Sequence, residues 1–169
     1  LDAAKPGVTL LKIDSLADRL IREAGGTASF KTIKDYKWAT CLCVNDVVVH
    51  GIPTEYALGE GDILTIDVGM LYKGLHTDTA WTKIVHNTQY TVHSDLQKFL
   101  QTGEEALWKA IDQARAGNRV GHISQTIQQI IEGAGYGIVK TLVGHGVGGE
   151  LHEAPQVPGF LKTPIAATP

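Results

Sequence analysis

Two aspartates interrupt a stretch of this sequence that otherwise has the pattern of a buried β-hairpin. Asp67 follows the apolar, β-branched run at residues 63–66, and Asp78 follows the turn signal Lys73-Gly74. A two-residue loop centred on Tyr72-Lys73 or on Lys73-Gly74 would place the two carboxylates opposite or diagonal to each other on one face. Two buried like charges destabilise a fold unless a divalent cation lies between them or one of them keeps a proton. We therefore expect the rest of the chain to be organised around this hairpin.

The composition fits one globular domain, with 43% hydrophobic and 20% charged residues in 169. The formal net charge of −3 gives no basic excess for nucleic acid or an anionic membrane surface. No apolar run reaches the ~20 residues that span a bilayer, and the start of the chain lacks a signal peptide's apolar core. Cys41 and Cys43 lie two apart on an alternating segment, a poor geometry for a disulfide. We expect a cytoplasmic protein that binds no nucleic acid and no membrane, with a processed or incomplete amino terminus because residue 1 is leucine.

The local patterns predict a mixture of helices and strands. Spacing of apolar residues predicts a helix within residues 7–26, and alternation predicts strands on both sides of Asn45-Asp46 within residues 38–49. The second strand of the aspartate hairpin is expected to continue over residues 79–85. A further helix is expected from about 96 to 116, with the following apolar residues facing inward: Leu100, Leu107, Ala110 and Ile111.

An internal repeat relates the two ends of the chain. An offset of 110 residues aligns Gly7 with Gly117, Ile13 with Ile123, and Gly25 with Gly135. Two glycine-flanked helices can match by chance, but we favour a duplication. The repeat predicts one α+β domain over residues 1–169, with pseudo-symmetric halves at about 1–114 and 115–169. The second half is expected to be incomplete, because it lacks a counterpart of the aspartate hairpin.

The second half contains a histidine between glycines, in the run Gly144-His145-Gly146. Such glycines let a metal or a substrate approach the imidazole closely, whereas the lysine of a phosphate-binding loop is missing. Two aspartates and one imidazole suit Mn, Fe(II), Co or Zn, which generate hydroxide from water near neutral pH. Each residue taken singly is more simply explained as a solvated carboxylate or a loop histidine. The combination with two more histidines, His50 and His152, favours a hydrolytic metal site.

The motifs around these residues resemble those of the type I methionine aminopeptidases. The similar segments are residues 44–53, 61–67, 74–79, 144–148 and 152–157, and the resemblance covers nearly the whole chain. It implies the pita-bread fold, in which two pseudo-symmetric halves surround a dinuclear site for divalent ions. It also implies that Asp67 and His145 are metal ligands and that Asp78 bridges both metals.

The same resemblance implies roles for residues around the metals. His50 would contact the scissile amide, and His152 would help to stabilise the tetrahedral intermediate formed by a metal-bridging hydroxide. Tyr36 and Cys41 match positions that line the methionine pocket. A monovalent ion, Na or K, would be held partly by backbone carbonyls, those of Asn45 and Val47. The implied substrates are the N-terminal peptides of nascent proteins, which would lose their initiator methionine.

Some positions depart from the family pattern. The family uses two further glutamate ligands in its second half, and neither Glu150 nor Glu153 matches them. We therefore expect the 169-residue chain to bind metal weakly and to turn over poorly. Leu151 replaces a usual aromatic residue, and Phe30 and Ile33 differ from the usual pocket residues. The family resemblance implies a monomer, and a truncated chain would expose a sheet edge and self-associate.

Two other functions remain open at this point. A proline-specific peptidase that cleaves Xaa-Pro peptides has the same fold, the two aspartates and the histidine. A non-catalytic module that binds peptide or protein could keep the fold without the chemistry. The presence of both aspartates with all three histidines favours an enzyme, because a pure binding module has no chemical need for that set.

Overall fold

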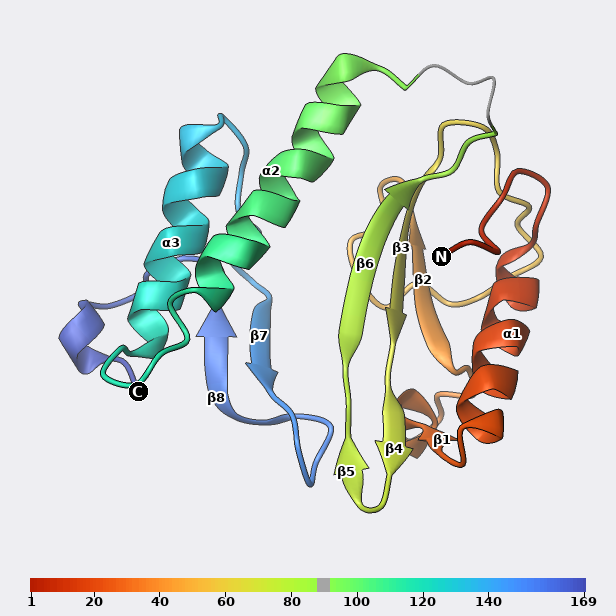
Figure 1. Cartoon of the computed structure of the whole chain (residues 1–169), viewed down its shortest axis with the longest axis horizontal. Coiled ribbons are helices and arrows are strands. Elements are labelled where there is room, and N and C mark those ends of the chain that lie inside the picture. The colour runs from red at the N-terminus through yellow and green to blue at the C-terminus, as the bar shows by residue number, and fades with distance from the viewer. Residues whose placement is uncertain (88–91) are drawn as a thin grey trace. The chain divides into compact units, whose positions relative to one another are not determined.

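The computed structural model describes residues 1–87 and 92–169 (Figure 1). Its contacts divide the chain into two compact units: Leu1–Val92 with Val147–Leu151, and His93–Gly146 with His152–Pro169. Both units combine helices with strands, so the α+β class is confirmed. The predicted halves, 1–114 and 115–169, are defined by a sequence repeat rather than by contacts, and they stay a prediction.

The first unit begins with helix α1 (Leu10–Glu23), which lies within the predicted range of residues 7–26. Thr9 caps the helix by accepting a hydrogen bond from the Lys12 amide, and Gly25 (φ +81°) follows its end. The buried face of α1 packs into a core that it shares with strand and loop residues. This core consists of Ala4, Leu10, Ile13, Leu42, Leu58, Leu64 and Val85.

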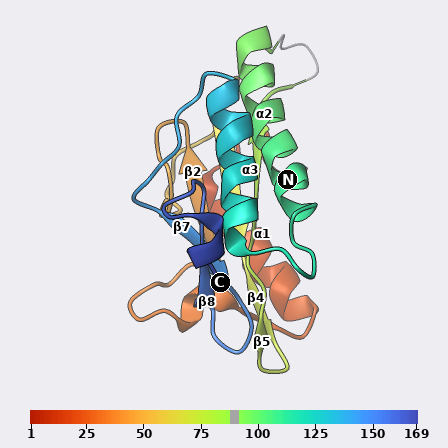
Figure 2. The ribbon, with the colours of Figure 1, turned by 90° about the vertical axis from the view of Figure 1, so that its left-hand side faces the viewer.

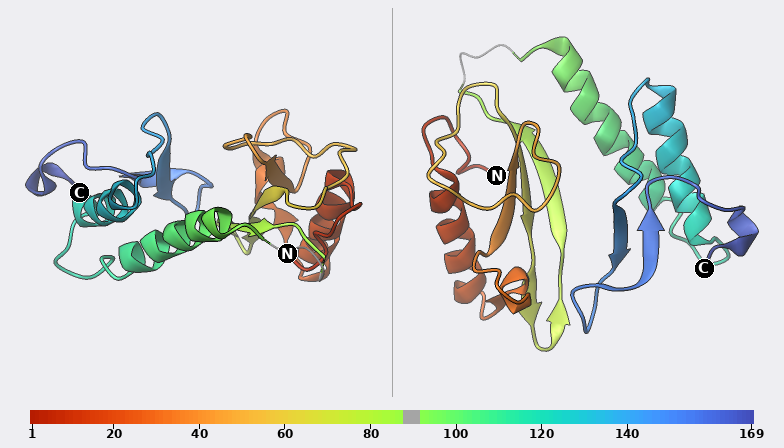
Figure 3. Two further views of the ribbon diagram at one scale, coloured as in Figure 1. Left: turned by 90° about the horizontal axis from the view of Figure 1, so that it is seen from above. Right: turned by 180° about the vertical axis from the view of Figure 1, so that it is seen from behind.

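The sheet of the first unit has three antiparallel strands in the order β2-β3-β6, and α1 lies along it (Figure 3). These strands are β2 (Thr40–Val44), β3 (Ile63–Val68) and β6 (Thr79–Ile84). A smaller sheet, in the order β1-β4-β5, contains β1 (Thr27–Ala28), β4 (Met70–Tyr72) and β5 (Leu75–His76). A short 3-10 helix, η1 (Ser29–Thr32), follows β1.

The strand expected after Asn45-Asp46 does not form, and that prediction is wrong. The chain instead leaves β2 at Asn45 and runs as a loop until Gly51, whose carbonyl accepts a hydrogen bond from the Leu42 amide at 2.8 Å. Further along, the carbonyls of Thr54 and Tyr56 accept from the first amides of α1 at 3.0 and 3.1 Å. The chain that follows residues 46–49 is thus bonded to β2 and α1.

A buried carboxylate joins α1 to the start of β2. Oδ1 of Asp14 accepts hydrogen bonds from the amides of Ala39 and Thr40, both at 2.9 Å, and from the Thr40 hydroxyl at 2.8 Å. Asp14 is 8% exposed, and both Ala39 and Thr40 are fully buried. Three donors at the start of the central sheet therefore depend on one oxygen atom.

Replacement of Asp14 by alanine is expected to destabilise the protein by about 3 kcal/mol, because buried donors lose their acceptor. Urea denaturation followed by circular dichroism measures the change. Asp46→Ala is the matched control, because Asp46 is an exposed aspartate in a loop of the same unit. Equal stabilities of the two variants would contradict the prediction.

The second unit contains two packed helices, α2 (Ser94–Ile111) and α3 (Val120–Gly133), which lie side by side in Figure 2. It also contains the antiparallel pair β7 (Val143–Gly146) and β8 (Glu153–Pro158), and a 3-10 helix, η2 (Ile165–Ala167). The rings of Phe99 and Tyr136 meet edge to face with centroids 5.2 Å apart. Over residues 1–87 and 92–169, none of the helices combines the length and the apolar character needed to cross a bilayer.

The predicted inward face of α2 is partly wrong. The helix ends at Ile111 rather than near residue 116, and Leu107 and Ile111 are 43% and 49% exposed. Its buried residues are Thr102, Ala106 and Ala110. Helix α2 packs against α3, and the residues that it buries all have small side chains.

Candidate functional site

Asp67 and Asp78 lie on one face of the hairpin, as the turn chemistry predicts. The β4–β5 loop consists of Lys73 and Gly74, both with positive φ (50° and 81°), since Tyr72 pairs with Leu75. Asp67 pairs with Ala80 in the β3–β6 ladder, and Asp78 lies two residues before Ala80, directly ahead of β6. The two carboxylates are therefore diagonal neighbours rather than directly opposite each other.

The carboxylates of Asp67 and Asp78 interact with each other electrostatically. Burial raises the pKa of Asp67 to about 7, and the charge of Asp78 and a hydrogen bond with it contribute to that rise. An amide hydrogen bond from Val68 opposes it. A half-buried carboxylate pair of this kind is stabilised by a shared proton or by a cation, so its donor chemistry fits a divalent metal ion.

A buried wall of side chains lies next to this pair. Cys41 is directly opposite Asp67 in the β2–β3 ladder, and its thiol lies 3.2 Å from the Tyr36 hydroxyl, which donates to the Thr40 carbonyl at 2.8 Å. Burial raises the pKa of the Cys41 thiol to about 11, so the thiol stays protonated at neutral pH. Phe30 and Leu151 complete the cluster with Cys41, and Tyr36 packs against it.

His50 lies on an exposed loop in a left-handed backbone conformation, with φ +56°. The next residue holds this loop against β2, because the Gly51 amide donates to Sγ of Cys43 at 3.4 Å. A Cβ atom at Gly51 would collide with the Leu42 carbonyl oxygen, so only glycine fits there. Asn45 and Val47, the predicted carbonyl donors for a monovalent ion, lie at the start of the same loop.

The second unit brings His145 and His152 together. His145 is in β7 and His152 directly precedes β8, and their ring centroids are 4.4 Å apart at an interplanar angle of 53°. Nδ1 of His145 donates to the Gly146 carbonyl at 2.9 Å, because a carbonyl oxygen only accepts. In a neutral imidazole this bond places the proton on Nδ1 and the lone pair on Nε2, the form that ligates metals.

The structure thus collects the predicted residues in two groups. The first unit holds Tyr36, Cys41, Asn45, Val47, His50, Asp67 and Asp78, and the second unit holds His145 and His152. Within the part of the chain that the structure describes, no group of three or more histidine, cysteine, aspartate or glutamate side chains could hold a metal ion. The complete ligand set therefore stays a prediction.

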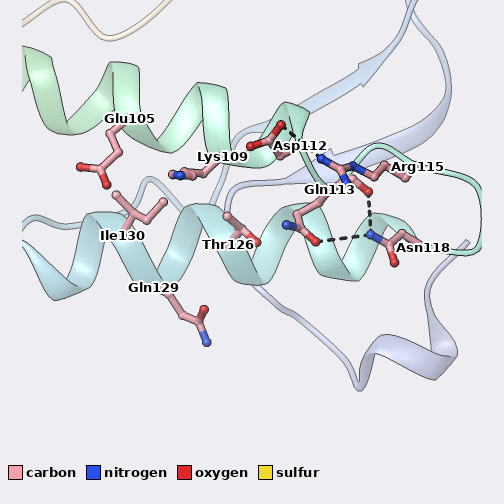
Figure 4. Close-up of a pocket in the computed structure, with 9 residues that line it drawn as sticks. All are labelled: Glu105, Lys109, Asp112, Gln113, Arg115, Asn118, Thr126, Gln129 and Ile130. Carbon is pink, nitrogen blue, oxygen red and sulfur yellow. Dashed lines mark hydrogen bonds and ion pairs between the residues drawn. The ribbon is translucent and has the colours of Figure 1, made fainter.

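A hollow of about 550 Å³ lies between α2 and α3 (Figure 4). Its lining is mainly polar and charged, and it includes Glu105, Lys109, Asp112 and Arg115. None of the predicted site residues lines it, and Arg115 forms an ion pair with Asp112 at 3.5 Å on its rim. The hollow and the aspartate hairpin therefore have no residue in common.

Sequence reasoning missed Asp14, which holds the start of the strand that carries Cys41. A signal was present, because Asp14 falls on the apolar stripe of its helix, between Ile13 and Ala17. A carboxylate on a buried stripe needs buried donors, and the amides at the start of β2 supply them.

Comparison with known proteins gives a consistent picture. The model of metallopeptidase family M24 matches residues 1–168. Methionine aminopeptidase 1 of Bacillus subtilis (strain 168) is 40% identical over 156 residues, which are 92% of this chain and 61% of the relative. A methionine aminopeptidase of Clostridium perfringens is 38% identical over 159 residues, 94% of this chain and 62% of the relative. The chain thus spans about three fifths of the length of these curated relatives.

Solved structures agree in fold. Methionine aminopeptidase from Thermotoga maritima matches with a TM-score of 0.92 and 35% identity, over 99% of this chain and 66% of that one. The prolidase from Pyrococcus horikoshii matches with a TM-score of 0.76 and 23% identity, over 94% of this chain and 44% of that one, and so shows the fold alone. The predicted pita-bread fold is confirmed.

Proposed function

This chain belongs to metallopeptidase family M24. From that membership we propose that it removes methionine from the N-termini of nascent proteins in a metal-dependent reaction. The main observation in support of the proposal is the half-buried pair of Asp67 and Asp78, because a cation would stabilise their negative charge. Relatives named methionine aminopeptidases, 33–40% identical over at least 90% of this chain, support the choice of substrate. We place the reaction in the cytoplasm, in keeping with two buried free cysteines.

The proposed metal ligands are Asp67, Asp78 and Nε2 of His145, for two divalent ions of the Mn, Fe, Co or Zn type. Oxygen and imidazole donors fit these ions, and the raised pKa of Asp67 fits a site that gains stability from a cation. Bound there, the ions would supply Lewis-acid charge for hydrolysis of the first peptide bond. The carbonyls of Asn45 and Val47 are proposed to hold a monovalent ion, Na or K.

The remaining residues are proposed to bind and orient the substrate. His50 would hydrogen-bond the scissile amide, and His152 would donate a proton or a hydrogen bond towards the carbonyl oxygen as negative charge develops there. Tyr36 and Cys41, with Phe30 and Leu151, form an apolar wall that suits a methionine thioether. Because burial keeps the Cys41 thiol protonated, it contributes packing rather than a nucleophile.

The test is a metal titration and an assay on the same 169-residue chain. Isothermal titration calorimetry with Mn²⁺ or Co²⁺ should give a weak metal-dependent heat, because the two further glutamates implied by the family resemblance have no match here. Met-Ala peptides should lose methionine in a metal-dependent reaction that is slow compared with a complete enzyme.

Each alternative function has its own outcome in these assays. Cleavage of Xaa-Pro peptides with none of Met-Ala would replace the proposal by a proline-specific peptidase. The absence of any metal-dependent heat, with no change on Asp78→Asn, would favour a peptide-binding or protein-binding module. Turnover at the rate of a complete enzyme would refute the expectation that this chain is impaired.

A further inference from the structure

One carboxylate, that of Asp62, closes both ends of the loop that carries His50. Its Oδ1 accepts a hydrogen bond from Nδ2 of Asn45 at 2.9 Å. Its Oδ2 accepts from the Tyr56 hydroxyl at 2.9 Å and from the Gly59 amide at 2.8 Å. Asn45 directly follows β2 and Tyr56 lies beyond His50, so the chain between them forms a loop with Asp62 at its neck.

Asn45 has its side-chain amide fixed in one orientation. Its Oδ1 accepts from the Ile63 amide at 2.9 Å, while its own backbone amide donates to the Ile63 carbonyl at 2.9 Å. Nδ2 must therefore point at Asp62, and the side chain cannot turn over without setting an NH₂ group against the Ile63 amide. Asn45 also has a left-handed backbone (φ +53°), which asparagine adopts more readily than most residues.

The tip of the loop has little packing of its own. Val47, Val48, Val49 and Ile52 are between 43% and 61% exposed, and His50 is also exposed. The left-handed conformation of His50 costs free energy that the rest of the loop must offset. The order of this segment thus depends on the contact of Gly51 with β2, on the bonds from α1 to the carbonyls of Thr54 and Tyr56, and on the neck at Asp62.

We infer that Asp62 is a positioning residue for His50: by joining Asn45, Tyr56 and Gly59 it holds the loop in the shape that presents the imidazole. The catalytic meaning of that imidazole rests on the function proposed above, whereas the positioning itself does not. Burial acts to raise the pKa of Asp62, but the three hydrogen bonds outweigh burial and lower it, so the carboxylate is charged at neutral pH.

The hydrogen-bond pattern provides its own control. In Asp62→Asn an NH₂ group must face either Asn45 or the Gly59 amide, and each of these is a donor. The double variant Asn45→Asp with Asp62→Asn exchanges the two groups. The carboxylate introduced at position 45 accepts from the Ile63 amide and from the side-chain amide introduced at position 62, whose oxygen accepts from Gly59 and Tyr56. The double variant therefore restores every bond of the neck.

Limited proteolysis with thermolysin, which cleaves before large apolar residues, measures the loop directly at pH 7.5. Mass spectrometry then separates cuts within residues 46–52 from cuts within β3. We expect Asp62→Asn to speed cleavage of the loop about tenfold or more relative to β3, from the loss of charge-assisted hydrogen bonds. Asp46→Asn, at an exposed aspartate in the same loop, should cleave like the wild type. The double variant should return to within about twofold of it.

A second measurement reports on His50 itself. The NMR signal of the His50 ring proton Hε1 should be a single line in the wild type and in the double variant, and broadened or split in Asp62→Asn. Equal acceleration of cleavage at the loop and in β3 would show only global destabilisation, and it would overturn the inference. A double variant that stays as open as Asp62→Asn would do the same. Neither readout needs catalysis, so failure of the proposed peptidase activity leaves this test intact.

Discussion

Replacing Asp78 by asparagine is expected to weaken binding of Mn²⁺ or Co²⁺ to the 169-residue chain by more than about 100-fold. The amide keeps the size of the carboxylate but loses the charge that pairs with the cation. Calorimetric titration of the metal-free protein at pH 7.5 measures the change. Loss of the metal-binding heat in Asp78→Asn would show that the ion binds at the aspartate hairpin.

The same substitution, Asp78→Asn, is expected to have the opposite effect on the stability of the metal-free protein, and this distinguishes a metal ligand from a structural residue. Because Asp78 repels Asp67 across the hairpin, its neutralisation should leave the metal-free chain as stable as the wild type or more stable, by about 1 kcal/mol. A merely structural residue would lose stability when it is replaced. Asp95→Asn, in the first turn of α2, serves as the control and should leave the affinity unchanged. Unchanged affinity in Asp78→Asn would instead assign the ion to other carboxylates, such as Glu105 and Asp112 beside the hollow of the second unit.

The aspartate hairpin was predictable because local chemistry determines it. Lys73-Gly74 adopts the positive φ values that a two-residue hairpin loop requires, and that loop determines which residues of β3 and β6 face each other. The turn signal placed Asp67 and Asp78 on one face and left two loop centres open, and the observed loop at Lys73-Gly74 makes them diagonal neighbours. The grouping of the predicted ligands with His145 does not follow in this way, since it depends on a second unit far along the sequence.

Long-range contacts account for what the sequence pattern missed. Residues 46–49 have a strand-like composition, but Gly51 bonds to β2 and the carbonyls of Thr54 and Tyr56 bond to α1, and these contacts hold the segment as a loop. In α2 the pattern predicted that Leu107 and Ile111 face inward, whereas the helix packs against α3 and buries Ala106 instead. The elements that contact these two segments cannot be identified from the local sequence alone.

The stability of the metal-free chain should fall as the pH rises from 5 to 8, and Asp67→Asn should remove part of that fall. In the folded protein burial and Asp78 raise the pKa of Asp67 to about 7, against 3.8 as the reference value. The folded state therefore holds a proton that the unfolded state has already released. This contribution to stability is complete below pH 4 and is lost as the pH passes through 7. With the site about half exposed, solvent screening limits its size to about 2 kcal/mol.

Other groups can be separated from this effect. The pKa values of Asp18 and Asp62 are lowered, so their contributions change only at more acidic pH, and the thiol of Cys41, with a pKa raised to about 11, stays neutral throughout. The histidines are common to wild type and Asp67→Asn, so their contributions cancel when the two proteins are compared. Urea midpoints at pH 5, 6, 7 and 8 give the difference.

Addition of Co²⁺ should reverse the change of stability with pH in the wild type, and it should leave the pH dependence of Asp67→Asn unaffected. A cation competes with the shared proton, so its affinity increases as the pH rises and the carboxylates lose that proton. Ligand binding to the folded state then adds stability at the pH values where the metal-free pair is least stable. A slope that is the same with and without Co²⁺, in a protein that binds the ion, would mean that the ion does not lie between these two carboxylates. A reversed pH dependence would identify the like-charged pair of Asp67 and Asp78 in the hairpin as half of a metal site.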